Sequence, residues 1–388
     1  PGSIDLIRTG VESDFFSFGG SALGGALTSN GRPVEVFAEN DVNGPSYVGR
    51  VGGASGDVVF RLQLTDTSNG DADYLFRLVQ PLDHADPNDP NDIIDLNFVV
   101  TATDADGDSI PVTIPVQVKD DVPTIGDSAG DVDESGADFA AGETLTTSDT
   151  LETNFGADVA SIAPTGSVVV CDHNGNDITS SFTSAGRAVT FALVGNTYIG
   201  STAGGVEVVR VDIDPTTGRY VYTQSQPLDH TDTSDDNEVI TFKFGVQVVA
   251  NDGTTDTGTI TIDVGDAGPE AIDDVNGAEE GQTITGDVVA NDTPDADGAR
   301  VTEITFNGTT HSVDPVNGVT IPTAFGTLTF NADGTYEYSV PESTVDPNGD
   351  EVIGYTLTDQ DGDTSSATLT ITVTPDGQPV SVDAEREV

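Results

Sequence analysis

Two short stretches of the chain place an aspartate at every second position around a single glycine. They are DADGD at residues 104–108 and DQDGD at residues 359–363. Carboxylates at alternate positions of a tight turn can converge on one hard cation, and without a cation these like charges would repel one another. Because Ca²⁺ prefers about six to eight oxygen ligands, each turn is a candidate source of calcium ligands. The candidates are Asp104, Asp106 and Asp108 in the first turn and Asp359, Asp361 and Asp363 in the second.

These turns are not EF-hands, because an EF-hand loop also carries an acid at its twelfth position. Pro115 and Thr370 occupy that position here, so the remaining oxygen ligands must come from elsewhere in the fold. A third acidic turn has the related pattern D-x-N-x-D, formed by Asp346, Asn348 and Asp350. For any single turn of this kind the alternative is a solvated hairpin tip that binds no ion.

The elements that must position these turns repeat along the chain. The stretch QPLDH at residues 80–84 recurs at 226–230, a constant offset of 146 residues. A fixed-period echo of this kind indicates tandem modules. Each acidic loop that begins there could supply ligands to a cation or could simply keep the surface soluble. The predicted units are residues 1–123, 124–269 and 270–379, with 380–388 as the start of a following unit.

Acidic residues also flank the prolines at which the units join, namely Pro123 and Pro269. A cation held by acids on both sides of a junction would fix the angle between two units. We therefore predict further calcium ligands in these linkers. The candidates are Asp120, Asp121 and Glu134 around the first junction and Asp266, Asp273 and Asp274 around the second.

The segments between the loops alternate apolar and polar residues, as strands with one buried face do. Examples are VVFRLQL at 58–64 and VITFKFGVQVV at 239–249. Asn-Gly pairs, as at 30–31 and 307–308, supply the positive φ that hairpin turns require. We therefore predict an all-β protein of tandem immunoglobulin-like or cadherin-like β-sandwich domains in an elongated array.

The charge of the chain restricts its partners. Lys and Arg number 12 against 67 Asp and Glu, for a formal net charge of −55. Nucleic acid and anionic membranes attract basic proteins, so we expect neither as a partner. Such acidity suits either a disordered chain or an acidic fold neutralised by cations, and the apolar content of 35% favours the fold. No apolar run approaches the ~18 residues of a membrane helix, so we expect no membrane insertion.

The sequence offers no catalytic constellation. His84 and His230 each follow an aspartate, but their equivalent places in the repeat favour a structural role. No activated serine or cysteine signature, zinc-protease motif or phosphate-binding glycine loop stands near them. We therefore expect a protein that is not an enzyme.

The chain resembles the large repeats-in-toxin (RTX) adhesins that Gram-negative bacteria export by type I secretion. The resemblance rests on the T-D-x-D-G-D entries at 103–108 and 358–363, on the D-x-x-P junctions, and on the run 279–292, which is similar to cadherin-like and VCBS-type repeats. It implies calcium-rigidified extender modules that hold a ligand-binding tip away from the cell for biofilm formation or surface attachment. Calcium coordination would fall first on the two D-x-D-G-D turns. The second unit departs from the pattern, with Thr254 in place of the last aspartate.

The resemblance also implies a place outside the bacterial cell, with anchoring through parts beyond this sequence. The expected partners are neighbouring modules of the same chain, and the expected state is a monomer. As an alternative, the Gly-, Ser- and Thr-rich segments 10–57 and 135–205 could bind a sugar or a peptide with the help of calcium. A third possibility is homotypic adhesion of the cadherin kind.

Overall fold

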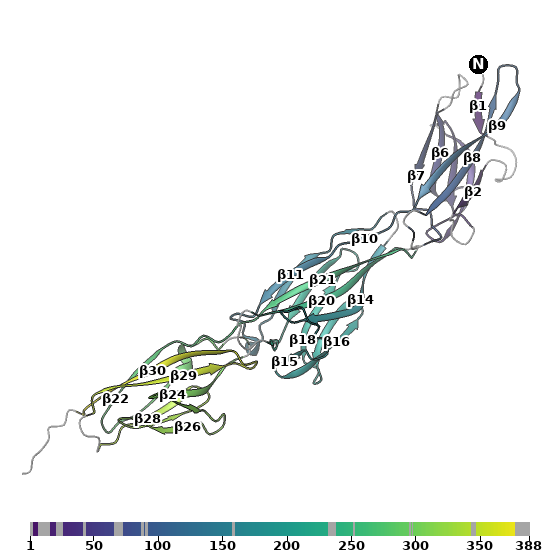
Figure 1. The fold of residues 1–388 in the computed structure, drawn as a ribbon. Coiled ribbons are helices and arrows are strands. Elements are labelled where there is room, and N and C mark those ends of the chain that lie inside the picture. The colour runs from purple at the N-terminus through teal and green to yellow at the C-terminus, as the bar shows by residue number, and fades with distance from the viewer. Residues whose placement is uncertain are drawn as a thin grey trace, which may run out of the picture.

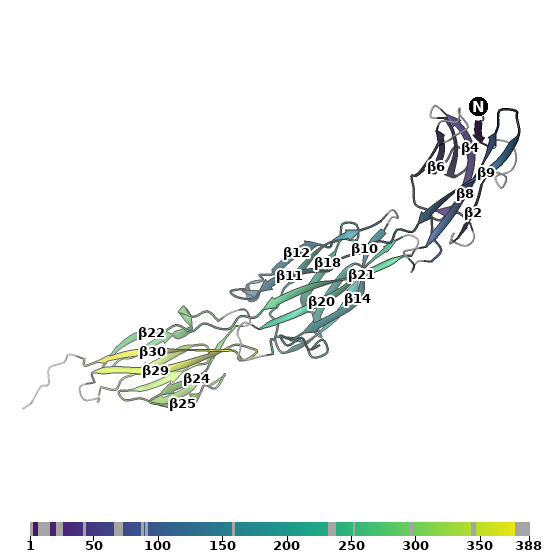
Figure 2. The same cartoon turned by 45° about the horizontal axis from the view of Figure 1, so that its top comes forward.

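The computed structural model contains three β-rich bodies that follow one another along an extended line (Figure 1). Turning the molecule by 45° leaves the bodies separate and end to end, so the array is elongated (Figure 2). The predicted fold class, tandem β-sandwiches without α-helices, is confirmed for the described part of the chain. The structure describes residues 3–6, 16–20, 26–41, 44–65, 73–86, 89, 92–156, 160–231, 238–250, 253–294, 296, 298–342 and 347–376.

The strands form where the apolar alternation predicts them. In β8 (Ile93–Thr103), Ile94, Leu96, Phe98 and Val100 are buried, and the residues between them are not. Successive side chains of a strand point to opposite faces, so this alternation gives each strand one core face and one solvent face. The same pattern runs through β20 (Val239–Ala250) in the second body.

The first body packs two antiparallel sheets face to face. Phe98 of β8 and Phe60 of the other sheet meet edge to face, with ring centroids 5.9 Å apart. One sheet contains β1 (Ser3–Leu6), β8, β2 (Phe16–Gly20) and β9 (Ser109–Lys119). The other contains β3 (Thr28–Ser29), β4 (Arg32–Asp41), β5 (Gly44–Val51), β6 (Asp57–Thr65) and β7 (Asp73–Leu78).

The second body is a larger sandwich around Phe242 and Phe244, both fully buried. Its first sheet has the order β11 (Ser128–Asp133), β21 (Thr255–Gly265), β20, β14 (Ala160–Cys171). Its second has the order β12 (Leu145–Thr150), β19 (Arg219–Gln224), β18 (Glu207–Ile213), β17 (Thr197–Thr202), β16 (Arg187–Val194), β15 (Thr183–Ser184). The short pair β10 (Thr124–Ile125) and β13 (Thr153–Asn154) and the 3₁₀ helix η3 (Phe139–Ala141) complete it.

The third body is shorter and surrounds Phe330, Tyr338 and Tyr355. One sheet has the order β22 (Asp274–Glu279), β30 (Thr364–Thr374), β29 (Gly349–Thr358), β24 (Arg300–Phe306), β25 (Thr309–Ser312). The other has the order β23 (Thr283–Asp287), β28 (Thr335–Ser339), β27 (Thr327–Phe330), β26 (Val319–Pro322), and the 3₁₀ helix η4 (Val288–Asn291) follows β23.

The second and third bodies share one topological device. Their first long strand pairs parallel with their last: β11 with β21, and β22 with β30. All other strand pairs of these two bodies in the described residues are antiparallel. Since parallel strands end at the same edge of a sheet, this device places the residues after the first strand beside the linker that leaves the body.

Each body has its own hydrophobic core, whose buried members come from separate stretches of chain: 16–118, 125–264 and 278–373. The two Asn-Gly turns named above form as predicted, because both residues of each pair have positive φ. Among the described residues, no helix has the length and apolar character needed to span a membrane.

Candidate metal centre

The second and third bodies meet where β11 and β21 end. Asp133 of β11 lies opposite Gly265 of β21 in the parallel register, so the next residues, Glu134 and Asp266, are brought to the same edge. The backbone N–H of Glu134 donates a hydrogen bond of 3.1 Å to the carbonyl of Gly265. The junction therefore begins with two acids that the backbone pairing itself places side by side.

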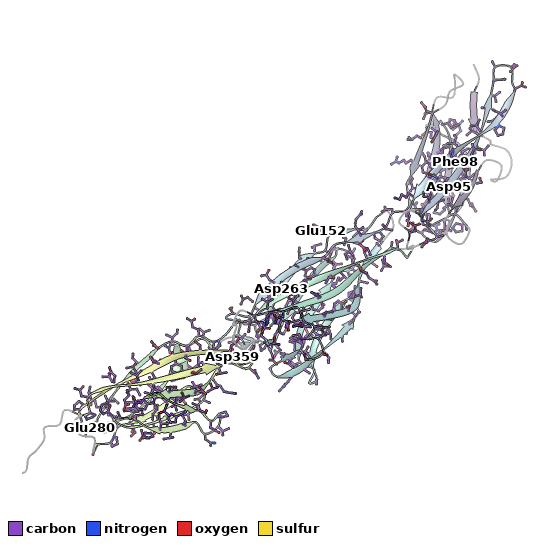
Figure 3. All side chains as sticks on the ribbon, viewed as in Figure 1. Asp95, Phe98, Glu152, Asp263, Glu280 and Asp359 are labelled. Carbon is purple, nitrogen blue, oxygen red and sulfur yellow. The ribbon has the colours of Figure 1, made fainter. Side chains whose placement is uncertain are left out.

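The third body contributes the DQDGD turn between β29 and β30, and Figure 3 places its first residue, Asp359, at the junction. Oδ1 of Asp359 accepts hydrogen bonds from the backbone N–H of Gly362 at 2.9 Å and of Asp363 at 2.7 Å. Gly362 has a φ of 117°, which glycine adopts without steric cost. The first aspartate thus closes the turn, and the carboxylates of Asp361 and Asp363 extend from a fixed frame.

Carboxylates from both bodies converge at this junction. Oδ2 of Asp361 accepts a hydrogen bond of 3.1 Å from the backbone N–H of His230 in the second body. Asp266, Asp361 and Asp363 each offer an oxygen within 4.8 Å of the others. Asp266 and Asp363 are buried and Asp361 is half-buried. A cation bound here would therefore have ligands from two successive units.

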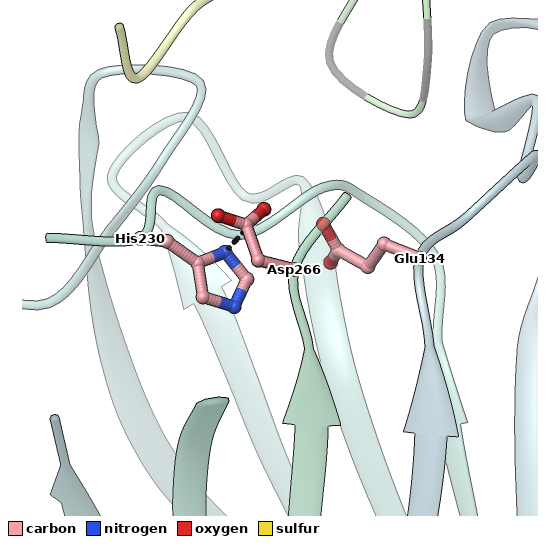
Figure 4. A group of neighbouring side chains, drawn as sticks. All are labelled: Glu134, His230 and Asp266. Atoms are coloured by element: carbon pink, nitrogen blue, oxygen red, sulfur yellow. Dashed lines mark ion pairs between the residues drawn. The ribbon is translucent and has the colours of Figure 1, made fainter. Parts of the chain in front are cut away.

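A second group of ligand atoms shares Asp266 (Figure 4). Glu134, His230 and Asp266 are all buried, and one ligand atom of each lies within 4.8 Å of the others. Nδ1 of His230 lies 3.2 Å from Oδ1 of Asp266 and 3.3 Å from the carbonyl oxygen of Leu228. Nε2 of the same ring lies 3.4 Å from the carbonyl oxygen of Val264. The imidazole is therefore held between the linker and the end of β21.

Glu134 is fixed by a buried polar network. Its Oε1 accepts hydrogen bonds from the backbone N–H of Leu228, at 3.1 Å, and from Nε2 of Gln224. Gln224 in turn accepts a hydrogen bond of 3.2 Å from the hydroxyl of Tyr222, and burial raises the pKa of that hydroxyl well above its ordinary value. These hydrogen bonds attach the Glu134 carboxylate to the second body.

The electrostatics of the junction disfavour its charged groups. Burial, with a further contribution from Asp361, raises the pKa of Asp266 to about 8. Burial and a hydrogen bond to Asp361 raise the pKa of Asp359 to about 7. Burial also lowers the pKa of His230. Burial is the main cause of all three shifts, and neighbouring carboxylates add to those of Asp266 and Asp359, so a bound divalent cation would favour the ionised carboxylates.

One atom of the cluster is left without a partner. Oδ2 of Asp266 is buried and has no hydrogen-bond partner among the described residues. Buried polar atoms are almost always satisfied, and an unsatisfied one indicates an unseen water or ion. Together with the carboxylate donors around it, this atom fits a hard divalent cation. The residues present therefore suit the predicted calcium ion.

The equivalent turn of the first body has the same internal geometry in a different setting. Oδ1 of Asp104 accepts hydrogen bonds from the backbone N–H of Gly107 at 3.1 Å and of Asp108 at 2.9 Å. Asp104, Asp106 and Asp108 offer oxygens within 4.8 Å of one another, and all three are exposed. This turn joins β8 and β9 at the end of the first body that points away from the second (Figure 1). Asp106 is therefore exposed, whereas Asp361 is half-buried and accepts a hydrogen bond from His230.

The first junction differs from the second. Oδ1 of Asp120 accepts a hydrogen bond of 2.8 Å from the backbone N–H of Asp121. Asp121 lies against Gly156 of the second body, where an added Cβ would come within 2.8 Å of its Oδ1. In the described part of the chain, neither acid belongs to a group of three ligand atoms as close as those of the second junction. Residues 251–252, in the turn where the sequence pattern departs, lie outside the described residues.

Three other predicted ligands, Asp273, Asp274 and Asp350, form hydrogen bonds within the third body. Oδ1 of Asp273 accepts two hydrogen bonds of 2.9 Å from the backbone N–H and the hydroxyl of Thr368, which lower the pKa of Asp273. Asp274 accepts a hydrogen bond of 3.2 Å from the hydroxyl of Tyr355, and burial raises its pKa. Oδ1 of Asp350 accepts a hydrogen bond of 2.8 Å from the hydroxyl of Thr372. Asn348 is exposed, and Asp346 lies outside the described residues.

The aspartate of each QPLDH loop accepts hydrogen bonds from the backbone of a hairpin turn. The two oxygens of Asp83 accept hydrogen bonds from the backbone N–H groups of Asn30, at 2.7 Å, and Gly31, at 2.8 Å, and so close the β3–β4 turn. Its counterpart Asp229 accepts a hydrogen bond of 2.8 Å from the backbone N–H of Gly186 in the β15–β16 turn. The repeat predicts a structural role for His230, and the one signal for a ligand role in the sequence is a histidine at the same place in both loops.

Comparison with family models supports the repeat. The model described as "Bacterial cadherin-like domain" matches residues 266–375. The model described as "Domain of unknown function (DUF5801)" matches twice, over residues 16–116 and 129–265, which together make up more than half of the chain. No curated protein sequence matches.

Among solved structures, the Drosophila N-cadherin EC1-4 fragment is 13% identical over 95% of this chain and 69% of that chain, with a TM-score of 0.20. The mouse clustered PcdhgC3 EC1-3 fragment is 14% identical over 83% of this chain and 87% of that chain, with a TM-score of 0.25. A nucleoside hydrolase-related hypothetical protein from Saccharophagus degradans is 15% identical over 27% of this chain and 25% of that chain, with a TM-score of 0.20. This chain thus spans a quarter of that protein's length. These low identities concern the fold alone.

The two matches to one model fall on the first two bodies, and the cadherin-like match begins at Asp266, the linker acid shared by both groups of ligand atoms. The third body is thereby similar to bacterial cadherin-like domains, and the chain as a whole belongs to the family described as Domain of unknown function (DUF5801).

Proposed function

We propose that this chain is a calcium-rigidified spacer in a bacterial surface adhesin of the repeats-in-toxin kind, exported by type I secretion. In this role it is not an enzyme. It works as a monomer outside the cell, and its partners are the neighbouring units of the same polypeptide. The spacer holds a ligand-binding tip away from the surface for attachment or biofilm formation. The cadherin-like third body, the elongated array and the net charge of −55 support this class of function.

The observation that carries the proposal is the shared acidic cluster at the second junction. Asp266 comes from the linker, and Asp361 and Asp363 come from the third body, yet their oxygens lie within 4.8 Å. A flexible joint would not need to gather buried like charges from two units, because each buried charge costs free energy unless it is compensated. A cation bound by both units offsets that cost and restricts rotation about the joint.

The residues that would hold Ca²⁺ are Asp266, Asp361 and Asp363. Bound calcium supplies the positive charge that the buried carboxylates otherwise lack. Extracellular calcium modules have dissociation constants of about 10⁻⁴ to 10⁻³ M. An ion present at about a hundred times its dissociation constant stabilises the folded state by roughly 2.7 kcal/mol, so a few such sites could decide whether a unit folds.

Calcium titration of the whole chain tests the proposal. Isothermal titration calorimetry in chelator-treated buffer should show saturable calcium binding, and small-angle X-ray scattering should show a longer maximum dimension with calcium than with EDTA. Circular dichroism in both buffers separates a change in the joints from unfolding of the units. A scattering profile and melting temperature that are the same in both buffers would remove the basis for the proposal.

A second candidate function is the binding of an extended peptide at a strand edge of the second body. One edge of β16 pairs with β17. The other edge pairs with β15, but only at Arg187 and Ala188. In the described chain, therefore, no strand pairs with the C-terminal half of this second edge of β16. Beside this edge runs a partly apolar groove of about 340 Å³, lined by residues that include Val168, Phe191 and Leu193. An extended peptide could add to such an edge as a further strand. A peptide array, with a Leu193→Lys variant as the control, tests this candidate.

A further inference from the structure

His230 brings a nitrogen ligand into a junction that is otherwise made of oxygens. Its ring is buried, and it lies with Glu134 and Asp266 in one group of ligand atoms within 4.8 Å (Figure 4). Calcium coordinates oxygen, whereas imidazole nitrogen suits zinc and the other first-row transition metals. This group therefore has a different metal preference from the aspartates of the third body.

The contacts of the His230 ring place its Nδ1 beside the carboxylate of Asp266. Nε2 lies 3.4 Å from the carbonyl oxygen of Val264, to which it can donate a hydrogen bond. Nδ1 lies 3.2 Å from Oδ1 of Asp266 and 3.3 Å from the carbonyl oxygen of Leu228. In the tautomer with its hydrogen on Nε2, the lone pair of Nδ1 is available to a cation that Oδ1 of Asp266 also binds.

The distances suit a small ion. Zinc binds imidazole nitrogen and carboxylate oxygen at about 2.0–2.2 Å with tetrahedral geometry, so two of its ligands are about 3.3 Å apart. The separation of 3.2 Å between Nδ1 of His230 and Oδ1 of Asp266 is close to this value. A metal-bound histidine also usually donates its other ring N–H to a carbonyl or carboxylate, which is the relation between Nε2 and Val264 here.

Two further observations point to a bound ion. Oδ2 of Asp266 is buried and lacks a hydrogen-bond partner among the described residues. The residue as a whole is only 7% exposed. The carboxylate of Glu134 is oriented by hydrogen bonds from Leu228 and Gln224 of the second body.

We propose that Glu134, His230 and Asp266 form a second metal site, for Zn²⁺ or a similar first-row transition-metal ion, beside the calcium ligands of the junction. Asp266 belongs to both sites and can offer one oxygen to each ion. The inference goes beyond the proposed calcium-stiffened spacer, because its ligand chemistry differs, and it stands whether or not calcium binds.

The repeat provides a matched control. His84 occupies the same place in the first QPLDH loop, and it is equally buried. Its Nδ1 lies 3.9 Å from Oδ2 of Asp92, and in the described residues His84 belongs to no group of three close ligand atoms. A zinc site that depends on the whole constellation should therefore need His230 and not His84.

The test uses tag-free protein labelled with ¹⁵N in its 4 histidines. Long-range ¹H–¹⁵N spectra are recorded with and without one equivalent of Zn²⁺, first in calcium-free buffer and then with calcium in excess. We expect the Nδ1 resonance of His230 to move to the metal-bound range in both buffers, while the resonances of the other histidines stay in place. An unmoved His230 resonance, or a His230 ring that is doubly protonated near neutral pH and ignores zinc, overturns the inference. Loss of the zinc effect in excess calcium would show a single shared site and overturn it too.

Calorimetry gives the affinity. Zinc affinity should fall by about tenfold or more in His230→Gln. Mutation of a residue that only hydrogen-bonds to a metal ligand already lowers metal affinity by about 10- to 100-fold. His84→Gln should bind zinc as the wild type does. Equal affinity in His230→Gln contradicts the site, and the wild-type spectra decide the question if that variant does not fold. Calcium binding, measured alone in the same samples, reports on the proposed spacer function separately.

Discussion

The side chain of Asp361 in the third body accepts a hydrogen bond of 3.1 Å from the backbone N–H of His230 in the second. This contact links two bodies across 131 positions of the sequence. Its acceptor is a carboxylate, and hydrogen bonds to charged acceptors are the stronger kind. A single contact still leaves rotation about one point, so a stiff joint needs the additional ligands that Asp266 and Asp363 provide through a shared cation.

The first prediction concerns Asp361→Asn, which keeps an acceptor oxygen and removes the charge. Calcium affinity at the junction should fall by about tenfold or more, because affinity follows the number of charged ligands. The gain in melting temperature from EDTA to calcium should shrink with it. Calorimetry and differential scanning calorimetry on the whole chain measure both effects.

Asp106→Asn is the matched control, since Asp106 has the same place in the exposed turn of the first body. It should leave the calcium-dependent stiffness of the second junction unchanged. If Asp106→Asn and Asp361→Asn had equal effects on that junction, the shared cluster would not be the source of its stiffness.

The second prediction is a pH dependence that appears only without calcium. The pKa of Asp266 is about 8 in the folded protein, above the ordinary 3.8 of an aspartate. The folded state therefore holds this proton more tightly than the unfolded state does. The resulting stabilisation is complete below about pH 4 and is lost as the pH rises through about 8. In EDTA, the melting temperature should fall over this window by more in the wild type than in Asp266→Asn, which cannot titrate.

Excess calcium should flatten the same pH profile at neutral pH, because the ion favours the ionised carboxylate. Parallel pH profiles of the wild type and Asp266→Asn in EDTA would mean that Asp266 does not carry the raised pKa. The difference between the two proteins matters here, since the general self-repulsion of so acidic a chain also grows with pH.

The third prediction separates structural acids from metal ligands. Asp83→Ala removes both acceptors of the Asn30-Gly31 turn, at 2.7 and 2.8 Å. Leaving these groups unpaired should destabilise the first body by about 1–3 kcal/mol. The loss should be the same in calcium and in EDTA, and the calcium stoichiometry should not change. A missing calcium ion in this variant would assign the QPLDH acid to a metal site instead.

The fourth prediction tests the independence of the cores. Phe242 is fully buried and contacts the rings of Phe182, Phe191, Tyr222 and Phe244. Phe242→Ala should cost about 3–5 kcal/mol and shift the unfolding transition of the second body. The transitions of the other two bodies should move far less. Val316→Ala, at a residue that is 88% exposed, should change stability by less than about 0.5 kcal/mol.

The elements that depend on local sequence could be predicted. Alternation alone indicates β8 and β20, because one residue in two must face the core. The closed shape of the DQDGD turn also follows from its own residues, since Asp359 binds N–H groups only three and four positions away. The role of glycine in that turn follows from its positive φ.

The candidate site could be predicted only in part, because its assembly depends on long-range pairing. Nothing in the period of β11 indicates that it runs parallel to β21, yet this pairing is what brings Glu134 beside Asp266. Asp273 and Asp274 look like linker acids in the sequence, whereas their hydrogen bonds to Thr368 and Tyr355 lie within the third body. The surroundings of these acids therefore depend on contacts with residues distant in the sequence, which sequence proximity to a junction does not reveal.

The stiffness of the second junction can be measured directly by double electron–electron resonance. Spin labels are placed at Val194→Cys in the second body and Val316→Cys in the third, both at exposed positions, in a Cys171→Ala background. With calcium at about 10 mM, well above the expected dissociation constant, the distance distribution should be narrow and single. With EDTA it should broaden severalfold. Distributions of equal width in the two buffers would contradict the account, because the bound ion would then have no part in holding the two bodies at a fixed angle.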